Sequence, residues 1–211
     1  VIGFTTVLIS VLVMWMNVHP LAAFAIALIV AATFGAVMGA AIHYLRVPSF
    51  IVTLAGMFLA RGGASVLSPD SIGITHPFYS AVSKSYLLLP GGGRLTVIGM
   101  IMLLVFAGAI VLAHRTRFGS NIYALGGSET SAALMGVPVA RTTILIYAMS
   151  SALAGLAGVV FSLYTSAGYS LNALGVELDA IAAVVIGGTL LTGGYGFVAG
   201  TFIGVLLQGL V

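Results

Sequence analysis

Few side chains in this sequence are of a type and spacing that could carry out covalent chemistry. No two histidines lie at i and i+4, and none has a carboxylate close by in sequence, so they predict no metal site. The absence of cysteine excludes disulfides and thiolate ligands. Neither a nucleophile elbow nor the phosphate-binding pattern GxxxxGK with a following Ser or Thr is present. We therefore expect no catalytic residue, metal or cofactor on this chain. The histidines concerned are His19, His43, His76 and His114.

Three ionisable residues are candidates for contact with a solute. Arg61 lies inside an apolar run, where a lone cation costs roughly 2.5–3.5 kcal/mol on insertion scales. It either belongs to a transport path or binds backbone carbonyls freed by Gly62 and Gly63. Glu177 and Asp179 are the only close acidic pair, and they either contact a polyhydroxyl solute or simply open a helix, whose dipole favours acids at that end.

The composition places these residues in a membrane protein. Hydrophobic residues make up 61% of the chain and charged residues 5%, and the mean hydropathy is +1.24, which is outside the range of soluble domains. The net charge of +3 is too small to favour a nucleic-acid partner. We expect an all-α fold: a polytopic transmembrane helical bundle with short or broken helices.

The apolar runs and their breaks define one transmembrane domain over 1–211. We expect it to be a fragment without a signal peptide, since both ends lie inside apolar runs. Pro20 suits the first turn of a helix, and Gly35 and Gly39 suit close helix contact. The predicted spans, judged by length, are 1–16, 21–42, 50–67, 96–113, 143–165 and 196–211, with a re-entrant or broken region at 176–194, a polar loop rich in breakers at 68–95 and a polar loop at 114–142.

The loop 114–142 contains signals for one short helix. Ser128 can cap its N-terminus, Glu129 then lies in the first turn, and Gly136 can end it in the left-handed conformation. A helix of about two turns is unstable alone. We therefore expect a partner protein to hold it, although a solvated loop is the alternative.

The basic residues predict the orientation in the membrane. If successive loops alternate sides, one side has four arginines and the other has Lys84 and Arg94, so the first side is cytoplasmic. This places the short helix inside the cell and the acidic pair at the outer face. The four arginines are Arg46, Arg115, Arg117 and Arg141.

Glycines interrupt the last third of the chain. Gly196, Gly200 and Gly204 repeat every four residues and predict a smooth face for helix contact. Broken helices are tolerated at membrane depth only where protein buries them or they line a wet cavity, so a transport path and a buried packing motif are both open. The segment 52–63 matches 183–194 weakly, as expected for two structural repeats.

Two segments carry a family resemblance. Residues 177–189, followed by Gly193, Gly194 and Gly196, resemble the signature of ribose-type sugar permeases of bacterial ABC importers. Residues 124–137 resemble that family's ATPase-docking loop. Residues 74–77 and 90–95 further resemble the galactofuranose-type permeases, whereas the family's Gly-Gly-x-Asp-Leu-Ser motif would lie before Val1.

The resemblance implies a multi-pass permease of the bacterial inner membrane. It would pair with a second permease, homologous or identical, a cytoplasmic ATPase dimer that binds ATP and Mg, and a periplasmic sugar-binding protein. The docking residues would be Ser128, Glu129, Ala132, Ala133, Leu134, Met135 and Gly136. The candidates for the translocation path are Arg61, Glu177, Asp179, Gly187, Gly188, Thr189, Gly193 and Gly194.

Two other classes of function remain open. The broken helices also suit an ion-gradient-driven secondary transporter or a channel. An intramembrane enzyme would need paired polar catalysts within the spans, and only Arg61 is there.

Overall fold

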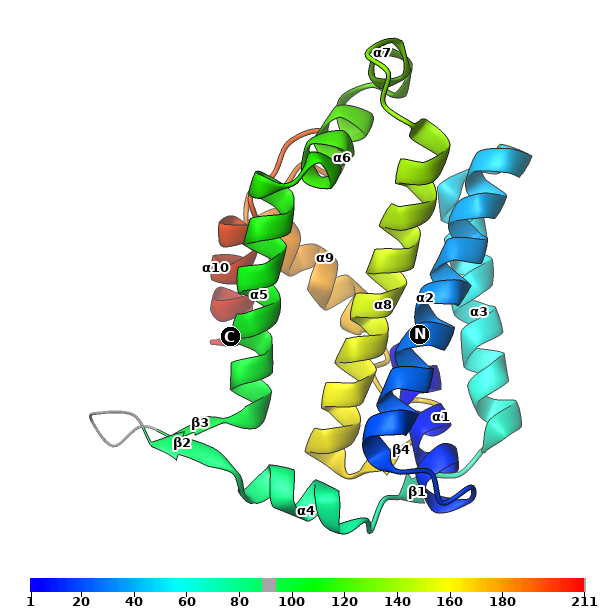
Figure 1. Cartoon of the computed structure of the whole chain (residues 1–211), viewed down its shortest axis with the longest axis vertical. Coiled ribbons are helices and arrows are strands. Elements are labelled where there is room, and N and C mark those ends of the chain that lie inside the picture. The colour runs from blue at the N-terminus through cyan, green and yellow to red at the C-terminus, as the bar shows by residue number, and fades with distance from the viewer. Residues whose placement is uncertain (89–93, 211) are drawn as a thin grey trace. The chain divides into compact units, whose positions relative to one another are not determined.

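A computed structural model of the chain describes residues 1–88 and 94–210 (Figure 1). The predicted breakers at 90–93 lie outside the described residues. The elements follow the order α1 (Ile2–Met14), α2 (Pro20–Leu45), α3 (Ser49–Leu67), β1 (Ile72–Gly73), α4 (Pro77–Lys84), β2 (Tyr86–Leu88), β3 (Arg94–Thr96), α5 (Val97–Arg115), α6 (Arg117–Gly127), α7 (Glu129–Leu134), α8 (Val139–Thr165), β4 (Ala167–Gly168), α9 (Val176–Ile186) and α10 (Val198–Gln208).

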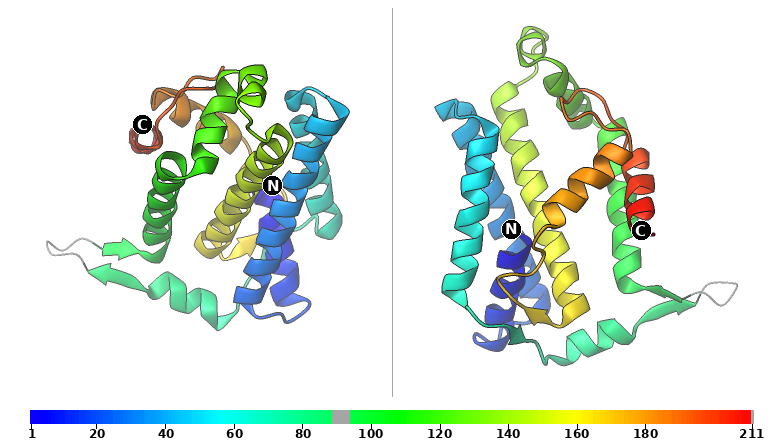
Figure 2. Two further views of the ribbon diagram at one scale, coloured as in Figure 1. Left: turned by 45° about the horizontal axis from the view of Figure 1, so that its top comes forward. Right: turned by 180° about the vertical axis from the view of Figure 1, so that it is seen from behind.

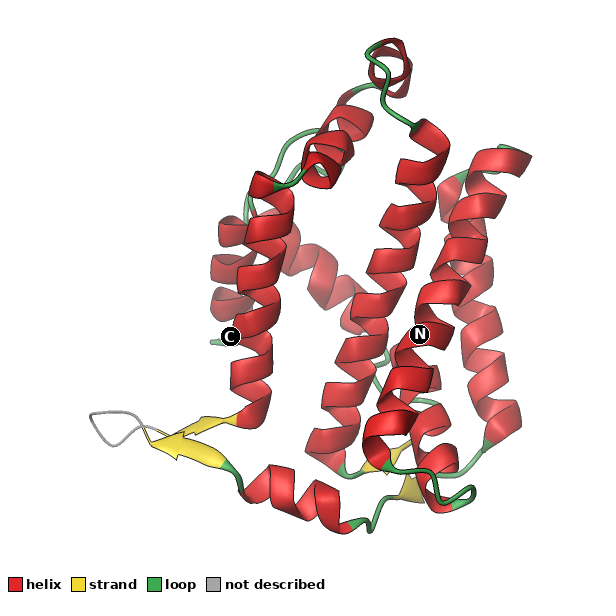
Figure 3. Ribbon diagram, in the orientation of Figure 1, coloured by secondary structure: helices red, strands yellow, loops and turns green. Residues whose placement is uncertain are grey.

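The expected all-α class is confirmed, since helices dominate the described residues and the strands form only short antiparallel pairs, β1 with β4 and β2 with β3 (Figure 3). Within the described residues, α2, α3, α5 and α8 are long and apolar enough to cross a membrane, whereas α1 and α10 are apolar but shorter. The predicted spans 21–42, 50–67, 96–113 and 143–165 overlap these four long helices. That each of them crosses the membrane stays a prediction.

Packing divides the chain into two compact units. Unit 1 comprises Val1–Gly99 and Thr143–Ala173, and unit 2 comprises Met100–Thr142 and Leu174–Val211.

In unit 1, α2 and α8 pack antiparallel through small residues. A Cβ atom added to Gly35 would lie 2.6 Å from the Cβ of Ser151, and one on Gly39 would lie 2.9 Å from the Cα of Ile144. The predicted close approach at these two glycines is therefore confirmed. It occurs because small residues recur every fourth position on α2, so that its backbone can touch a neighbour. The buried stripe consists of Ala23, Ala27, Ala31, Gly35 and Gly39.

At one end of unit 1, α4 covers the ends of the long helices. The sequence predicted only a polar loop over 68–95, and α4 corrects this prediction. Tyr79 is buried, and its hydroxyl shares a 3.3 Å hydrogen bond with Ser162 on α8. Burial raises the pKa of Tyr79, which keeps the hydroxyl protonated at neutral pH. His76 caps α4, since its Nδ1 accepts from the Phe78 N–H at 3.2 Å.

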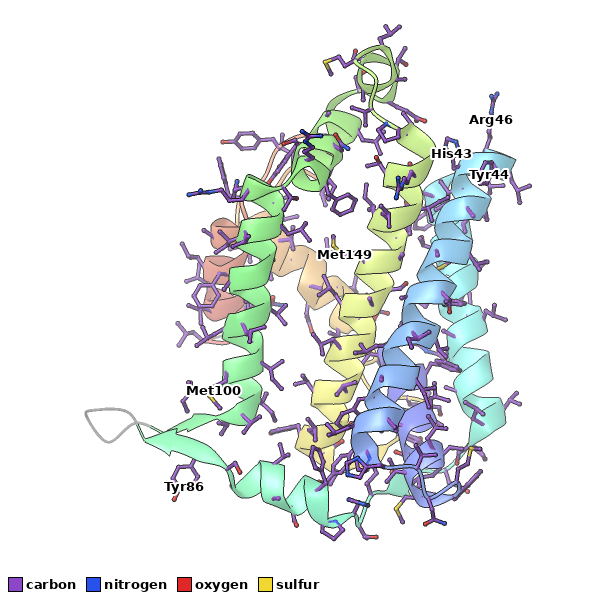
Figure 4. All side chains as sticks on the ribbon, viewed as in Figure 1. His43, Tyr44, Arg46, Tyr86, Met100 and Met149 are labelled. Carbon is purple, nitrogen blue, oxygen red and sulfur yellow. The ribbon has the colours of Figure 1, made fainter. Side chains whose placement is uncertain are left out.

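The other end of unit 1 carries basic and aromatic side chains. Arg46 follows α2 in the left-handed conformation with φ of 52°, and it lies with His43 and Tyr44 at this end of the helix (Figure 4). Because α2 and α8 are antiparallel, Ile144 near the start of α8 lies at the same end. This arrangement fits the alternation of loops on which the predicted orientation depends.

In unit 2, α9 and α10 form an antiparallel hairpin of two short helices. Gly200 contacts the backbone of Gly187, and Gly204 contacts the backbone of Ala183. The predicted contact face is thus confirmed for Gly200 and Gly204. It is wrong for Gly196, which precedes α10 and lies against Thr189, because the helix begins only at Val198.

Candidate functional site

The predicted short helix is present as α7. The Ser131 N–H donates to Ser128 Oγ at 3.2 Å, so Ser128 caps the helix, and Glu129 lies in its first turn. Gly136 has φ of +82°, and the Val137 N–H donates to Ala132 O at 3.0 Å, which closes the end of the helix. The helix has six residues, fewer than the expected two turns.

The seven predicted docking residues do not all face the same way. Ala132 is fully buried, so its side chain is not available to a partner. Leu134 and Met135 are 85% and 70% exposed. Ser128, Glu129, Ala133 and Gly136 are exposed as well. A short capped helix therefore presents two large apolar side chains at its C-terminal end.

Helix α6 precedes α7 and was missed in the sequence, where 114–142 was interpreted as a loop with a single helix. Thr116 caps α6 by accepting from the Gly119 N–H at 3.1 Å. Phe118, Ile122 and Leu125 lie at helical spacing and could have revealed it. The interpretation failed because glycines and polar residues dilute this pattern.

The C-terminal end of α6 crosses the loop that joins α9 to α10. A Cβ atom on Gly126 would lie 2.6 Å from Gly194 N, and one on Gly193 would lie 2.8 Å from Gly126 O. One on Gly194 would lie 2.9 Å from Gly127 Cα. The glycine pairs therefore meet backbone to backbone, and we call this contact the glycine crossing. It joins two motifs that are far apart in the sequence.

A side chain missed in the sequence ties the same two segments. The Tyr123 hydroxyl, one turn before Gly126 on α6, donates to Gly196 O at 2.8 Å. At the end of α5, the ring of His114 stacks on Phe197 with 6.4 Å between centroids. Hence the loop between α9 and α10 lies at the end of unit 2 where α5 and α6 meet (Figure 2, right).

The acidic pair lies at the opposite end of α9. Glu177 and Asp179 are exposed in its first turn, after Gly175 at φ of +84°. A helix of 11 residues is ~16 Å long, about half the hydrocarbon thickness. If the glycine crossing is at the inner face, the acids lie near mid-membrane. The position of the acidic pair at the outer face stays a prediction.

Arg61 lies on α3 in unit 1 and is half-buried. Within the described part of the chain, its guanidinium forms no hydrogen bond or ion pair, so the interpretation that it binds backbone carbonyls is wrong. The weak repeat is not structural either. Residues 52–63 form one continuous stretch of α3, whereas 183–194 contain the end of α9 and a turn with Gly193 and Gly194 at positive φ.

The whole chain is similar to known transport permeases. The profile of the family described as "Branched-chain amino acid transport system / permease component" matches residues 1–211. The chain is 53% identical over its full length to 64% of the inner membrane ABC transporter permease protein YjfF of Escherichia coli. It is 41% identical over 88% of its length to 56% of the fructose import permease protein FruG of Bifidobacterium longum. It is 39% identical over 92% of its length to 60% of the ribose import permease protein RbsC of Escherichia coli.

No solved structure matches the chain significantly. The chain spans about three-fifths of the length of these relatives.

Proposed function

Because the chain belongs to the family of branched-chain amino acid transport system permease components, we propose that it forms part of the membrane path of a bacterial ABC importer for a monosaccharide. Relatives named as ribose and fructose import permeases support a sugar as the solute. The protein would lie in the inner membrane and pair with a second permease, homologous or identical. A periplasmic sugar-binding protein would deliver the solute.

The observation that carries this proposal is the exposed end of α7. Leu134 and Met135 are exposed at the end of a helix that Ser128 caps, while Ala132 on the same helix is buried. Exposed apolar side chains on an ordered helix are typical of a protein contact. A cytoplasmic ATPase dimer that carries ATP and Mg is the partner that an importer requires there, since the chain belongs to a permease family and not to an ATPase family.

The finer proposal is a ribose- or galactofuranose-like solute. Glu177 and Asp179 supply carboxylate oxygens that accept hydrogen bonds from sugar hydroxyls. Their place at the start of a half-length helix is a usual setting for a transport site. Arg61 and the residues of the α9–α10 turn stay candidates for the same path.

The test is reconstitution of the full-length protein in vesicles with its ATPase and binding protein. We expect uptake of a labelled monosaccharide that needs all three components and ATP. Uptake driven by an ion gradient in vesicles without the ATPase would instead establish a secondary transporter. No uptake of any monosaccharide by the complete, ATP-hydrolysing complex would reject a sugar importer.

Residues 1–211 contain no cysteine, so single cysteines introduced there report orientation once any cysteine elsewhere in the full-length protein has been replaced. Leu134→Cys should react with an impermeant maleimide only in inside-out vesicles. Ser80→Cys, exposed on α4 at the other predicted side, should react in intact cells. The reverse pattern would contradict docking of an ATPase at α7.

A further inference from the structure

We infer that the glycine crossing is the contact that transmits movement of α7 to the α9–α10 hairpin, with Gly126 as its positioning residue. The inference rests on the proposed function. It names the part of unit 2 through which a docked ATPase would act on the transport path. The observation behind it is that two backbones touch with no side chain between them.

The crossing is close enough to transmit displacement in both directions. Gly126 and Gly194 already touch at van der Waals distance, since any Cβ on Gly126 would lie 2.6 Å from Gly194 N. Flexible side chains absorb small movements by changing rotamer, but bare backbones in contact do not. A shift of the end of α6 towards the loop therefore moves the loop.

A second contact makes the crossing resist rotation. The Tyr123 hydroxyl donates a hydrogen bond to Gly196 O at 2.8 Å. Tyr123 and Gly126 are three residues apart and therefore lie on the same face of α6. On the loop, the two attachment points are Gly194 and Gly196. Two points fix direction as well as distance, so α6 can pull the loop by the hydrogen bond and push it by the glycines.

Hydrogen bonds join the loop between α9 and α10 to the helices of the hairpin. The Leu190 N–H donates to Tyr195 O at 3.1 Å, and the Gly193 N–H donates to Leu190 O at 3.1 Å. The Thr189 N–H bonds to Val184 O at 3.2 Å, which joins the loop to α9. Because the two helices also touch at their glycines, a moved loop carries α9, and with it the acidic pair at its far end.

The connection from α7 to the glycine crossing is also direct. The Ser128 N–H donates to Ala124 O at 3.1 Å as the last bond of α6, and the Ser128 side chain caps α7. No linker separates the two helices. A partner that displaces Leu134 thus displaces the residues of the crossing.

The experiment compares Gly126→Ala with Gly127→Ala in the full-length protein, reconstituted with its ATPase and binding protein. Both changes give the same gain in helix propensity at neighbouring positions, but a Cβ on Gly127 meets nothing within 4 Å. We expect Gly126→Ala to lower sugar uptake per ATP hydrolysed about tenfold, a typical size for coupling between sites. Gly127→Ala should keep the wild-type ratio.

Equal ratios in the two variants, with the wild type coupled, would overturn the inference and leave the proposed function intact. A wild-type complex without ATP-dependent uptake would instead reject the proposed function. If Gly126→Ala does not assemble, Tyr123→Phe takes its place, since it removes one hydroxyl and keeps the ring. A wild-type ratio in Tyr123→Phe would then overturn the inference.

A measurement of conformational change distinguishes loss of transmitted movement from simple destabilisation of the protein. Val176→Cys places a thiol at the start of α9, and its rate of modification by a hydrophilic maleimide should change when a non-hydrolysable ATP analogue binds to the complex. That change should persist with Gly127→Ala and disappear with Gly126→Ala. A change that survives Gly126→Ala would show that α9 moves by another route and would overturn the inference.

Discussion

The two units solve the problem of holding apolar helices together in different ways. Unit 1 has a real interior, with large side chains such as Ile9 and Tyr79 fully buried beside the hydroxyls of Thr6, Ser10 and Ser162. In unit 2, the buried apolar side chains among the described residues are two alanines, Ala132 and Ala183. Its contacts are made by glycine backbones and by short helices.

Within residues 1–211, side-chain packing therefore holds unit 1 together more tightly than unit 2. Interlocked side chains and satisfied hydroxyls make unit 1 costly to deform. Unit 2 has little buried apolar surface to lose, and Leu190, Leu191 and Leu210 are exposed on it. Regions with few buried apolar contacts open and shift at low free energy.

The largest expected effect comes from overpacking unit 1. Gly35→Ala forces a Cβ atom against Ser151 and should lower the free energy of unfolding by up to about 3 kcal/mol. Gly62→Ala on α3 is the matched control, since a Cβ there meets nothing within 4 Å, and it should be neutral or slightly stabilising. Thermal unfolding of the full-length protein in detergent measures both. Equal melting temperatures would mean that α2 and α8 are not rigidly packed.

A smaller loss should follow removal of the buried phenol. Tyr79→Phe keeps the ring and deletes the hydrogen bond to Ser162, which still donates to Val159 O at 2.7 Å. Because the Ser162 hydroxyl keeps this second hydrogen bond, we expect the free energy of unfolding to fall by only about 1 kcal/mol. Denaturant unfolding measures it, with Tyr195→Phe, exposed in unit 2, as the control.

The same phenol predicts a pH dependence. Burial raises the pKa of Tyr79, so the folded state holds this proton more tightly than the unfolded state. The contribution is fully present below pH 10, the ordinary value, and is lost as the pH rises through the folded value. The wild type should therefore lose stability above pH 10 faster than Tyr79→Phe. Parallel pH profiles of melting temperature would contradict this.

Loss of the cap on α7 should remain local. Ser128→Ala removes the acceptor for the Ser131 N–H and should destabilise α7 by about 1 kcal/mol. Because unit 2 contains little cooperative packing, the melting temperature of the whole protein should hardly change. Hydrogen exchange should speed up at 129–136 only. Faster exchange throughout unit 1 would contradict a local effect of this cap.

The smallest effect on stability is expected at the tip of α7. Leu134→Ala combined with Met135→Ala removes side chains that are mostly exposed, and it should change stability by less than about 0.5 kcal/mol. Co-purification with the ATPase should nevertheless fall sharply. Thr130→Ser, a small change at an exposed residue of the same helix outside the seven predicted docking residues, is the control. Unchanged co-purification would place the docking surface elsewhere.

Local signals in the sequence predicted local structure well. The cap at Ser128, the left-handed Gly136 and the first-turn Pro20 each depend on groups a few residues apart, and all three are present. The helices α4 and α6 were missed because prolines, glycines and polar residues hide their short apolar patterns. For Arg61, the sequence left two interpretations open, a transport path or bonds to backbone carbonyls. Only the structure decided against the second, because the guanidinium forms no hydrogen bond within the described residues.

By itself, the sequence determined that this is a helical membrane protein and where its long apolar helices lie, because burial of apolar surface and the length needed to cross lipid depend on composition and order alone. It also showed two separate resemblances, one over 124–137, which contains Gly126 and Gly127, and one over 177–189, which Gly193 and Gly194 follow. Only the tertiary structure decided that these pairs touch. A glycine has no side chain from which a partner could be read, so contact between distant backbones depends on how α6, α9 and α10 pack.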